Sequence, residues 1–119
     1  MPLDKESQHK IINGKVISGL LVEQVNAAIS ELYKKDIKPT LAVVLIGNDP
    51  ASEVYVRNKK IMCEKVGIHS LEYKLTPDVQ ELELLSLIDS LNRDKNINGI
   101  LVQFPIPSHI SKQKIINTI

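Results

Sequence analysis

Lys59 occupies a position where the helical repeat predicts an apolar side chain, which makes it the strongest candidate for chemistry in the sequence. At about 100° per residue, the helix predicted after Gly47 places Lys59 within an apolar arc, in line with Ser52 and Tyr55. That apolar arc also contains Val56, Cys63, Val66 and Met62, whereas the opposite, charged arc contains Glu53, Arg57, Lys60 and Glu64. A lysine in apolar surroundings loses part of its preference for the charged form, so it can accept and return a proton near neutral pH.

Gln103 is the second candidate, because it is a polar residue at the end of the otherwise apolar run 99–104. An amide can hold a lysine in place without adding charge. In an open α/β sheet, ligands bind outside the carboxyl ends of the strands. If the strand that ends at Ile46 lies beside the strand that ends near Gln103, then Lys59 and Gln103 face one crevice. Tyr55 offers a flat face and a hydroxyl to a ring-shaped substrate there.

Each of these residues also has an ordinary structural explanation. A lysine at the rim of an apolar arc commonly extends its charged end to water, and a glutamine at a strand end is commonly a surface residue. Tyr55 taken alone fits a core position, and Ser52 in the first turn of a helix fits a local hydrogen bond. Their convergence at one end of a sheet is what favours a functional site.

Alternating helices and strands are predicted to position these residues. The apolar runs and their spacing predict strands over 41–46, 69–75 and 99–104, and helices over 18–35, 49–67, 79–91 and 112–119. Ser18 and Asp49 are the predicted N-caps of the first two helices, and Pro50 in the first turn and Gly67 at the end bound the second. The residues of the first helix that keep helical spacing are Leu21, Val25, Ala28, Ile29 and Leu32. In the third of these helices, the apolar spacing favours Leu82, Leu85, Ile88 and Leu91 as the core-facing residues. The order predicts an α/β fold with three layers, α-β-α, and a mostly parallel sheet of three strands in a flavodoxin-like arrangement.

The composition argues against several classes of function. The 119 residues carry a net charge of +1, and three tyrosines, one phenylalanine and no tryptophan leave little for base stacking, so no nucleic-acid partner is predicted. No apolar run reaches the length of a transmembrane helix, so no membrane partner is predicted either. Cys63 is the single cysteine, which favours a reducing compartment and a cytoplasmic location. The polar residues 1–10 are predicted to form a flexible leader.

Other potential ligand-binding residues lack the necessary spacing. His9, His69 and His109 do not have the spacing of metal ligands, so no metal site is predicted. Cys63 lies in the apolar arc and is expected to be a buried, inert thiol. The run 47–50 lacks the frame of a phosphate-binding loop, and no G-x-G-x-x-G motif is present. No cofactor-binding residue is therefore predicted within this chain.

Two runs of the sequence form a pair of motifs. The first motif is the run 44–52 followed by Tyr55, Val56, Lys59, Cys63, Gly67 and Ile68. The second is the run 99–107. Both resemble motifs of the bifunctional methylenetetrahydrofolate dehydrogenase/methenyltetrahydrofolate cyclohydrolase family, in which leucine is more usual at the position of Phe104. The start Asn13-Gly14-Lys15 also fits, so the resemblance covers the whole chain after the predicted leader.

The resemblance implies specific roles for the candidate residues. Lys59 would be the catalytic lysine, Tyr55 would stack on and orient the folate, and Gln103 would hydrogen-bond to Lys59 and tune it. The folate pocket would also be lined by Ser52, Val56, Val102 and Phe104. The implied reactions are oxidation of 5,10-methylenetetrahydrofolate to the 5,10-methenyl form by hydride transfer to NADP, and hydrolysis of that cation to 10-formyltetrahydrofolate. They belong to one-carbon metabolism, including purine biosynthesis, and the family enzyme is expected to be a homodimer.

The chain departs from the family pattern in its length. The NADP-binding Rossmann domain, a K-D-[VI]-D-G motif and a C-terminal helix of the family would follow Ile119. Residues 11–119 are therefore expected to be a truncated N-terminal folate-binding catalytic domain that does not bind NADP by itself. Two alternatives stay open, namely a fragment that binds folate or associates without turnover, and an unrelated flavodoxin-like interaction domain.

Overall fold

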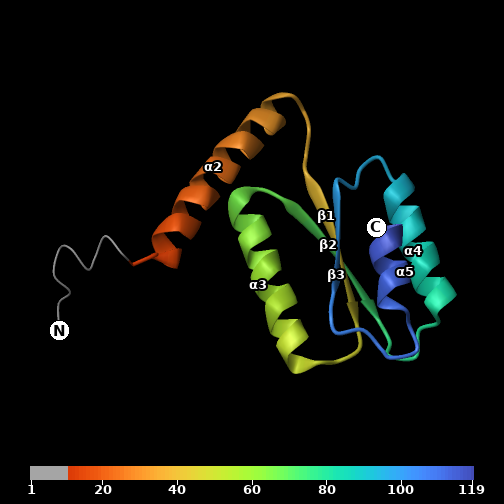
Figure 1. The fold of residues 1–119 in the computed structure, drawn as a ribbon. Coiled ribbons are helices and arrows are strands. Elements are labelled where there is room, and N and C mark those ends of the chain that lie inside the picture. The colour runs from red at the N-terminus through yellow and green to blue at the C-terminus, as the bar shows by residue number, and fades with distance from the viewer. Residues whose placement is uncertain (1–10) are drawn as a thin grey trace.

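The computed structural model describes residues 11–119 as a parallel sheet with helices on both faces (Figure 1). In chain order the elements are α2 (Gly14–Lys34), β1 (Thr40–Ile46), α3 (Pro50–Val66), β2 (His69–Leu75), α4 (Glu81–Arg93), β3 (Gly99–Gln103) and α5 (Lys112–Thr118). This alternation confirms the predicted α/β fold class. The leader predicted for residues 1–10 lies outside the described residues.

The three strands are parallel and lie in the order β2-β1-β3. Strand β1 is central, and its residues from Ala42 to Ile46 are all buried, which explains the unbroken apolar run in the sequence. Strand β2 alternates between exposed and half-buried residues, as a strand at the edge of the described sheet does. The order confirms that β1 and β3 are neighbours, so their carboxyl ends lie side by side.

Helices cover the two faces of the sheet unequally. Figure 1 shows α4 and α5 together on one face, and α3 on the other with α2 beyond it. Successive β1 side chains point to opposite faces. Those facing α4 and α5 join a large core cluster that includes Ala42, Val44, Ile46, Leu84, Ile88, Leu91 and Ile115. Those facing α3 form a smaller cluster of Val43, Leu45 and Val56. The α3 side therefore carries less buried apolar surface.

Helix α4 differs from the prediction in the face that it buries. Leu82 is 78% exposed, whereas Leu84 is fully buried at 0%. A three-residue spacing rotates by about 300° per step and drifts around the helix, so Leu82, Leu85, Ile88 and Leu91 do not form one face. Ile88 and Leu91 are buried as predicted, and with Leu84 they have the four- and three-residue spacing of a helical stripe. The predicted Leu85 is half-buried and packs against the same core, so only Leu82 lies off the buried face.

Helix α2 begins earlier than predicted and is more exposed than its sequence suggested. Asn13, not Ser18, is the N-cap, because its side chain accepts from the backbone N–H groups of Lys15 and Val16. Leu21 and Val25 are exposed and only Ile29 is buried. The helix packs against α3 near its own C-terminal end, where the Tyr33 hydroxyl donates to the Gly67 carbonyl at 2.7 Å.

The bounds of α3 confirm the predicted capping residues. The Asp49 side chain accepts from the backbone N–H of Ser52, and Pro50 is the first helical residue. Gly67 ends the helix in the left-handed region, with a φ of +92°. Among residues 11–119, no helix is both long enough and apolar enough to cross a membrane.

Glu81 gives the fold a predicted acid sensitivity, because its carboxylate joins the starts of α4 and α5. It accepts from the Ser111 backbone N–H at 2.7 Å and from the Lys114 ammonium at 2.9 Å. The Ser111 bond and then the Lys114 bond lower the pKa of Glu81 from its ordinary value of 4.5. A carboxyl with a lowered folded-state pKa stabilises the fold above its unfolded-state pKa, and this stability is lost as the pH falls through the folded-state pKa.

We therefore expect the wild-type chain to lose stability as the pH falls from about 4.5, and the Glu81→Gln variant to lose less over the same interval. Urea unfolding followed by circular dichroism at a series of pH values measures this difference. Glu83→Gln, on the exposed side of the same helix, is the matched control and is expected to follow the wild type. Parallel pH profiles for Glu81→Gln and the wild type would contradict the prediction.

Candidate active site

The carboxyl edge of the sheet brings the two leading candidates together. Leu45 of β1 pairs with Gln103 of β3, so both strands end at the same level. The chain leaves β1 through Gly47 and returns along the sheet as α3. Val56 packs against the β1 side chains and holds the helix there. Lys59 follows Val56 by three residues, so it lies on the sheet-facing side of α3.

Lys59 and Gln103 are joined by a hydrogen bond. The Lys59 Nζ atom donates to Gln103 Oε1 at 2.5 Å, between residues 44 positions apart in the sequence. Both side chains are half-buried. A charged donor makes such a bond stronger than one between neutral groups. The charged end of Lys59 is thus held by an amide at the strand end and does not simply extend into water.

Tyr55 lies one turn before Lys59 and presents its ring to solvent. The Lys59 Nζ atom is 5.9 Å from the ring centroid, within the range of a cation–π contact. Tyr55 is 58% exposed and Met62 is also exposed, although the sequence placed both in the apolar arc. The buried arc is narrower, because it covers only the side of α3 that faces the sheet. The exposed ring is therefore free to contact a planar ligand.

Ser52 lies beneath the surface of the site, in contact with Asp49. It is 2% exposed, and its Oγ atom donates to Asp49 Oδ2 at 2.8 Å and lies 3.5 Å from the Phe104 carbonyl oxygen. The hydroxyl bond and then the backbone bond from Ser52 lower the pKa of the Asp49 carboxyl. Sequence reasoning treated Asp49 only as an N-cap. Its spacing of three residues from Ser52 was the signal that the two side chains would meet.

The remaining predicted lining residues are not all brought to Lys59. Val56 is buried against the sheet under α3. Val102 packs in the cluster on the opposite face, because it alternates with Gln103 along β3. Phe104 follows Gln103 at the rim and is partly exposed, and its carbonyl oxygen accepts from Gln103 Nε2 at 3.1 Å. Of these three residues, Phe104 is the one with a hydrogen bond to the Lys59–Gln103 pair.

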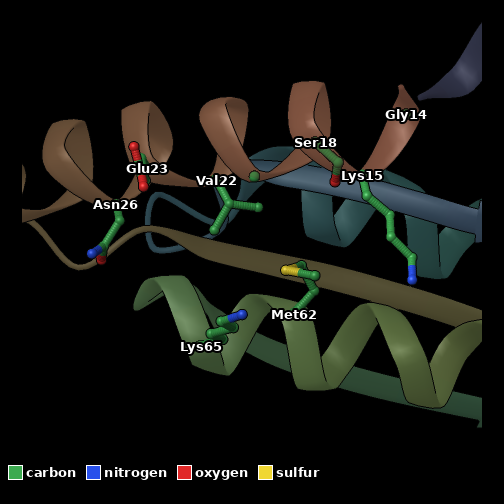
Figure 2. Close-up of a pocket in the computed structure, with 9 residues that line it drawn as sticks. Gly14, Lys15, Ser18, Val22, Glu23, Asn26, Met62 and Lys65 are labelled. Carbon is green, nitrogen blue, oxygen red and sulfur yellow. The ribbon is translucent and has the colours of Figure 1, made fainter. Parts of the chain in front are cut away.

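Two adjoining hollows extend from the site between α2 and α3. One has a volume of about 310 Å³ and is lined by Lys59 together with apolar residues of both helices. The other has a volume of about 760 Å³, and Ser18, Val22 and Met62 line both. Figure 2 shows Val22 of α2 and Met62 of α3 pointing toward one another across the second hollow. An apolar groove therefore opens beside Lys59.

The other titratable candidates lie apart from this pair. Cys63 is buried, and burial, followed by the nearby Glu64 carboxylate, raises the pKa of its thiol, as expected for an inert cysteine. His109 contacts the Val79 carbonyl oxygen at 2.7 Å on the α4 side of the sheet. Within residues 11–119, no group of three or more His, Cys, Asp or Glu side chains is arranged to hold a metal ion.

The sequence matches a known family model and several curated proteins. Residues 12–119 match the model described as the tetrahydrofolate dehydrogenase/cyclohydrolase catalytic domain. The bifunctional protein FolD of Agathobacter rectalis is 50% identical over 109 residues, which cover 92% of this chain and 39% of the relative. FolD of Methylobacillus flagellatus is 50% identical over 111 residues, covering 92% and 38%. The chain thus spans about two fifths of the length of these relatives.

Solved structures share the fold described above. The bifunctional FolD dehydrogenase/cyclohydrolase of Campylobacter jejuni superposes with a TM-score of 0.87 at 43% identity, covering 89% of this chain and 38% of that one. The 5,10-methylenetetrahydrofolate dehydrogenase of the silkworm Bombyx mori gives a TM-score of 0.87 at 34% identity, covering 92% and 38%. The similarity therefore extends over nearly all the described elements.

Proposed function

This chain belongs to the tetrahydrofolate dehydrogenase/cyclohydrolase family, and from that premise we propose that residues 11–119 form the folate-binding catalytic domain of an enzyme that interconverts 5,10-methylene-, 5,10-methenyl- and 10-formyltetrahydrofolate. The observation that carries the proposal is the hydrogen bond from Lys59 to Gln103 at the carboxyl edge of the sheet, beside the exposed ring of Tyr55. Lys59 is the proton carrier, Gln103 holds its amine in place, and Tyr55 offers a flat surface to a ring of the substrate.

The hydrolytic step needs a base, because it releases one proton. Water attacks the carbon between N5 and N10 of the methenyl cation and loses one proton. The bond from that carbon to N5 then breaks while the second water proton passes from the adduct's hydroxyl to N5, which leaves the formyl group on N10. Lys59 is the proposed acceptor of the proton from the attacking water, while Gln103 Oε1 keeps Nζ at the strand end.

Tyr55 and the neighbouring groove would orient the substrate. The ring face of Tyr55 is exposed next to Lys59, so a stacked pterin or benzoyl ring would lie within reach of the amine. Ring stacking contributes about 0.5–1.5 kcal/mol, and it fixes the plane of the substrate and therefore the direction of attack.

We also propose that NADP binds outside residues 1–119. The sequence contains no G-x-G-x-x-G motif. The N-terminus of α3 begins with the carboxylate of Asp49, which would repel a phosphate. The residues present do not fit the cofactor, and no part of the hydride transfer is assigned to them.

The homodimer and the cytoplasmic location expected from the family belong to the same proposal. The family membership supports the dimer, and the free Cys63 supports a reducing compartment. Analytical ultracentrifugation of the chain tests its association state directly. A non-catalytic folate-binding role is the second candidate, and it is supported by the exposed Tyr55 ring and the apolar groove beside Lys59, which can bind a ring without a reacting group.

Folate binding by the chain is the direct test of this proposal. Isothermal titration calorimetry with 5-formyltetrahydrofolate is expected to show saturable binding by the wild type. Tyr55→Ala is expected to weaken binding roughly 3- to 10-fold, since aromatic pairs contribute about 0.5–1.5 kcal/mol. Val54→Ala, an exposed neighbour on the same helix, is expected to bind like the wild type. No binding by the wild type, or equal binding by Tyr55→Ala, would contradict the proposal.

A further inference from the structure

The outer edge of β2 carries backbone groups that β1 does not pair. In the β1–β2 ladder, the His69 N–H donates to the Pro39 carbonyl at 2.9 Å. Successive residues of a strand direct their backbone groups to opposite sides. The odd-numbered residues of β2 therefore bond to β1, whereas Ser70, Glu72 and Lys74 direct their backbone groups away from it. Within residues 11–119, β1 is the strand that pairs with β2, so this outer edge is open to a further strand.

Two exposed side chains of opposite charge lie on this edge strand. Glu72 and Lys74 are two residues apart and exposed, and both line a hollow of about 300 Å³ on the α3 side of the sheet. Lys74 Nζ donates to Glu53 Oε1 of α3 at 3.0 Å. Among the described residues, Glu72 forms no ion pair. The edge therefore presents an acceptor and a donor of charge side by side.

The positions of these charges favour pairing with a second copy of the chain in one register. Two copies of a strand related by a two-fold axis pair antiparallel, so that residue i faces residue j and residue j faces residue i. With the axis at Tyr73, Glu72 of each copy lies opposite Lys74 of the other, which gives two attractive pairs. With the axis at Glu72 or at Lys74, identical charges would lie opposite one another and destabilise the pairing.

The backbone fits the same register. Glu72 and Lys74 both direct their backbone groups outward, so each Glu72–Lys74 pair between the copies would exchange two backbone hydrogen bonds. Tyr73 would then form a pair without backbone bonds, in which the side chains approach most closely. Tyr73 is half-buried and packs against the larger core cluster on the α4 side. Two such rings across the axis would cover apolar surface that one copy leaves partly exposed.

We propose that two copies of this chain associate through the outer edges of β2, antiparallel and with the two-fold axis at Tyr73. The pairing joins the two three-stranded sheets into one. A second copy is the occupant that the charges favour, because the edge is complementary to itself in this register. The assignment names a surface for the proposed homodimer and rests on that part of the proposed function, but it does not depend on folate binding.

Reversal and restoration of charge test this pairing. Sedimentation velocity of the full chain at a series of concentrations measures the dissociation constant of the dimer. Glu72→Lys turns both attractive pairs into repulsive ones and is expected to raise this constant roughly 10-fold. Adding Lys74→Glu to that variant restores opposite charges and is expected to return the constant to within about threefold of the wild type. Glu64→Lys, an equal change of charge on the exposed face of α3, is the matched control.

Amide hydrogen exchange locates the interface. Protection of the Glu72 and Lys74 N–H groups is expected to rise with chain concentration in the wild type and in Glu64→Lys, but not in Glu72→Lys. Protection that is equal at all concentrations would mean that another segment of the same chain covers the edge, and this result would overturn the proposal. A double variant that does not associate again, although its circular dichroism shows it folded, would do the same.

The outcomes separate this pairing from the proposed function. If the wild type and Glu72→Lys dimerise equally, the pairing through β2 is wrong, and the homodimer uses another surface. If the wild type stays monomeric, both the pairing and the homodimer are wrong. Folate binding is measured separately by calorimetry with 5-formyltetrahydrofolate, so neither result bears on the proposed folate site.

Discussion

The Lys59→Met variant is expected to hydrolyse 5,10-methenyltetrahydrofolate about 10²- to 10⁴-fold more slowly than the wild-type chain, which is the usual contribution of a positioned acid–base group. Methionine keeps the length and the apolar stem of lysine but cannot carry a proton. The Lys59–Gln103 hydrogen bond is lost as well, so the side chain at position 59 is no longer held at the end of β3. The decay of the methenyl absorbance, corrected for spontaneous hydrolysis, measures the rate.

Lys60→Met is the matched control for this experiment. Lys60 is the next residue of α3 and is exposed on its charged face, so the same change of charge occurs away from Gln103. Its rate is expected to equal that of the wild type, and the helical circular dichroism of both variants verifies that they are folded. Equal rates for wild type and Lys59→Met would show that the chain does not use this lysine and would favour the binding-only alternative.

Leu84→Ala is expected to lower the free energy of unfolding by about 3 kcal/mol, within the roughly 2–5 kcal/mol seen for buried leucines. Leu84 is fully buried between α4 and the sheet, where its side chain joins the larger core cluster. Removing its terminal atoms costs the transfer free energy of those atoms and leaves a cavity that the neighbouring side chains only partly fill. Equilibrium unfolding in urea, with unchanged m-values, measures the loss.

Leu82→Ala makes the same chemical change two residues away and is the control. Leu82 is 78% exposed, so its replacement is expected to change the free energy of unfolding by less than about 0.5 kcal/mol. If Leu82→Ala were the more damaging variant, α4 would have to bury the face that the three-residue spacing suggested. The two variants together therefore test which face α4 turns toward the sheet, and how much the buried leucine contributes to the free energy of unfolding.

Local patterns in the sequence were enough to predict the elements of this fold. The unbroken apolar run of β1, the N-cap Asp49 and the C-terminal Gly67 each act over a few residues, so neighbours in the sequence encode them. Where the predicted start of a helix was wrong, the choice was between two capping residues close together in the sequence. Asn13 is as good an N-cap as Ser18, and its position sets the true start of α2.

The faces that the helices bury were less predictable. Leu21 and Val25 have helical spacing, but they line an open groove between α2 and α3, so these side chains stay exposed. Tyr55 and Met62 are exposed for a related reason, since the sheet covers only one narrow side of α3. Burial depends on which element lies opposite, and a helical pattern does not contain that information.

By itself, the sequence determined the order of the elements, the two ends of α3, and the separation of Lys59 from the other charges of its helix, because period and capping are properties of neighbouring residues. It also suggested Gln103 as a partner, but only on the condition that β1 and β3 lie side by side. The tertiary structure decided that condition through the strand order β2-β1-β3. It also brought Ser52 Oγ to 3.5 Å from the Phe104 carbonyl oxygen and turned Val102 to the opposite face. These contacts join residues distant in sequence, and only the packing of helices on the sheet brings them within hydrogen-bond distance.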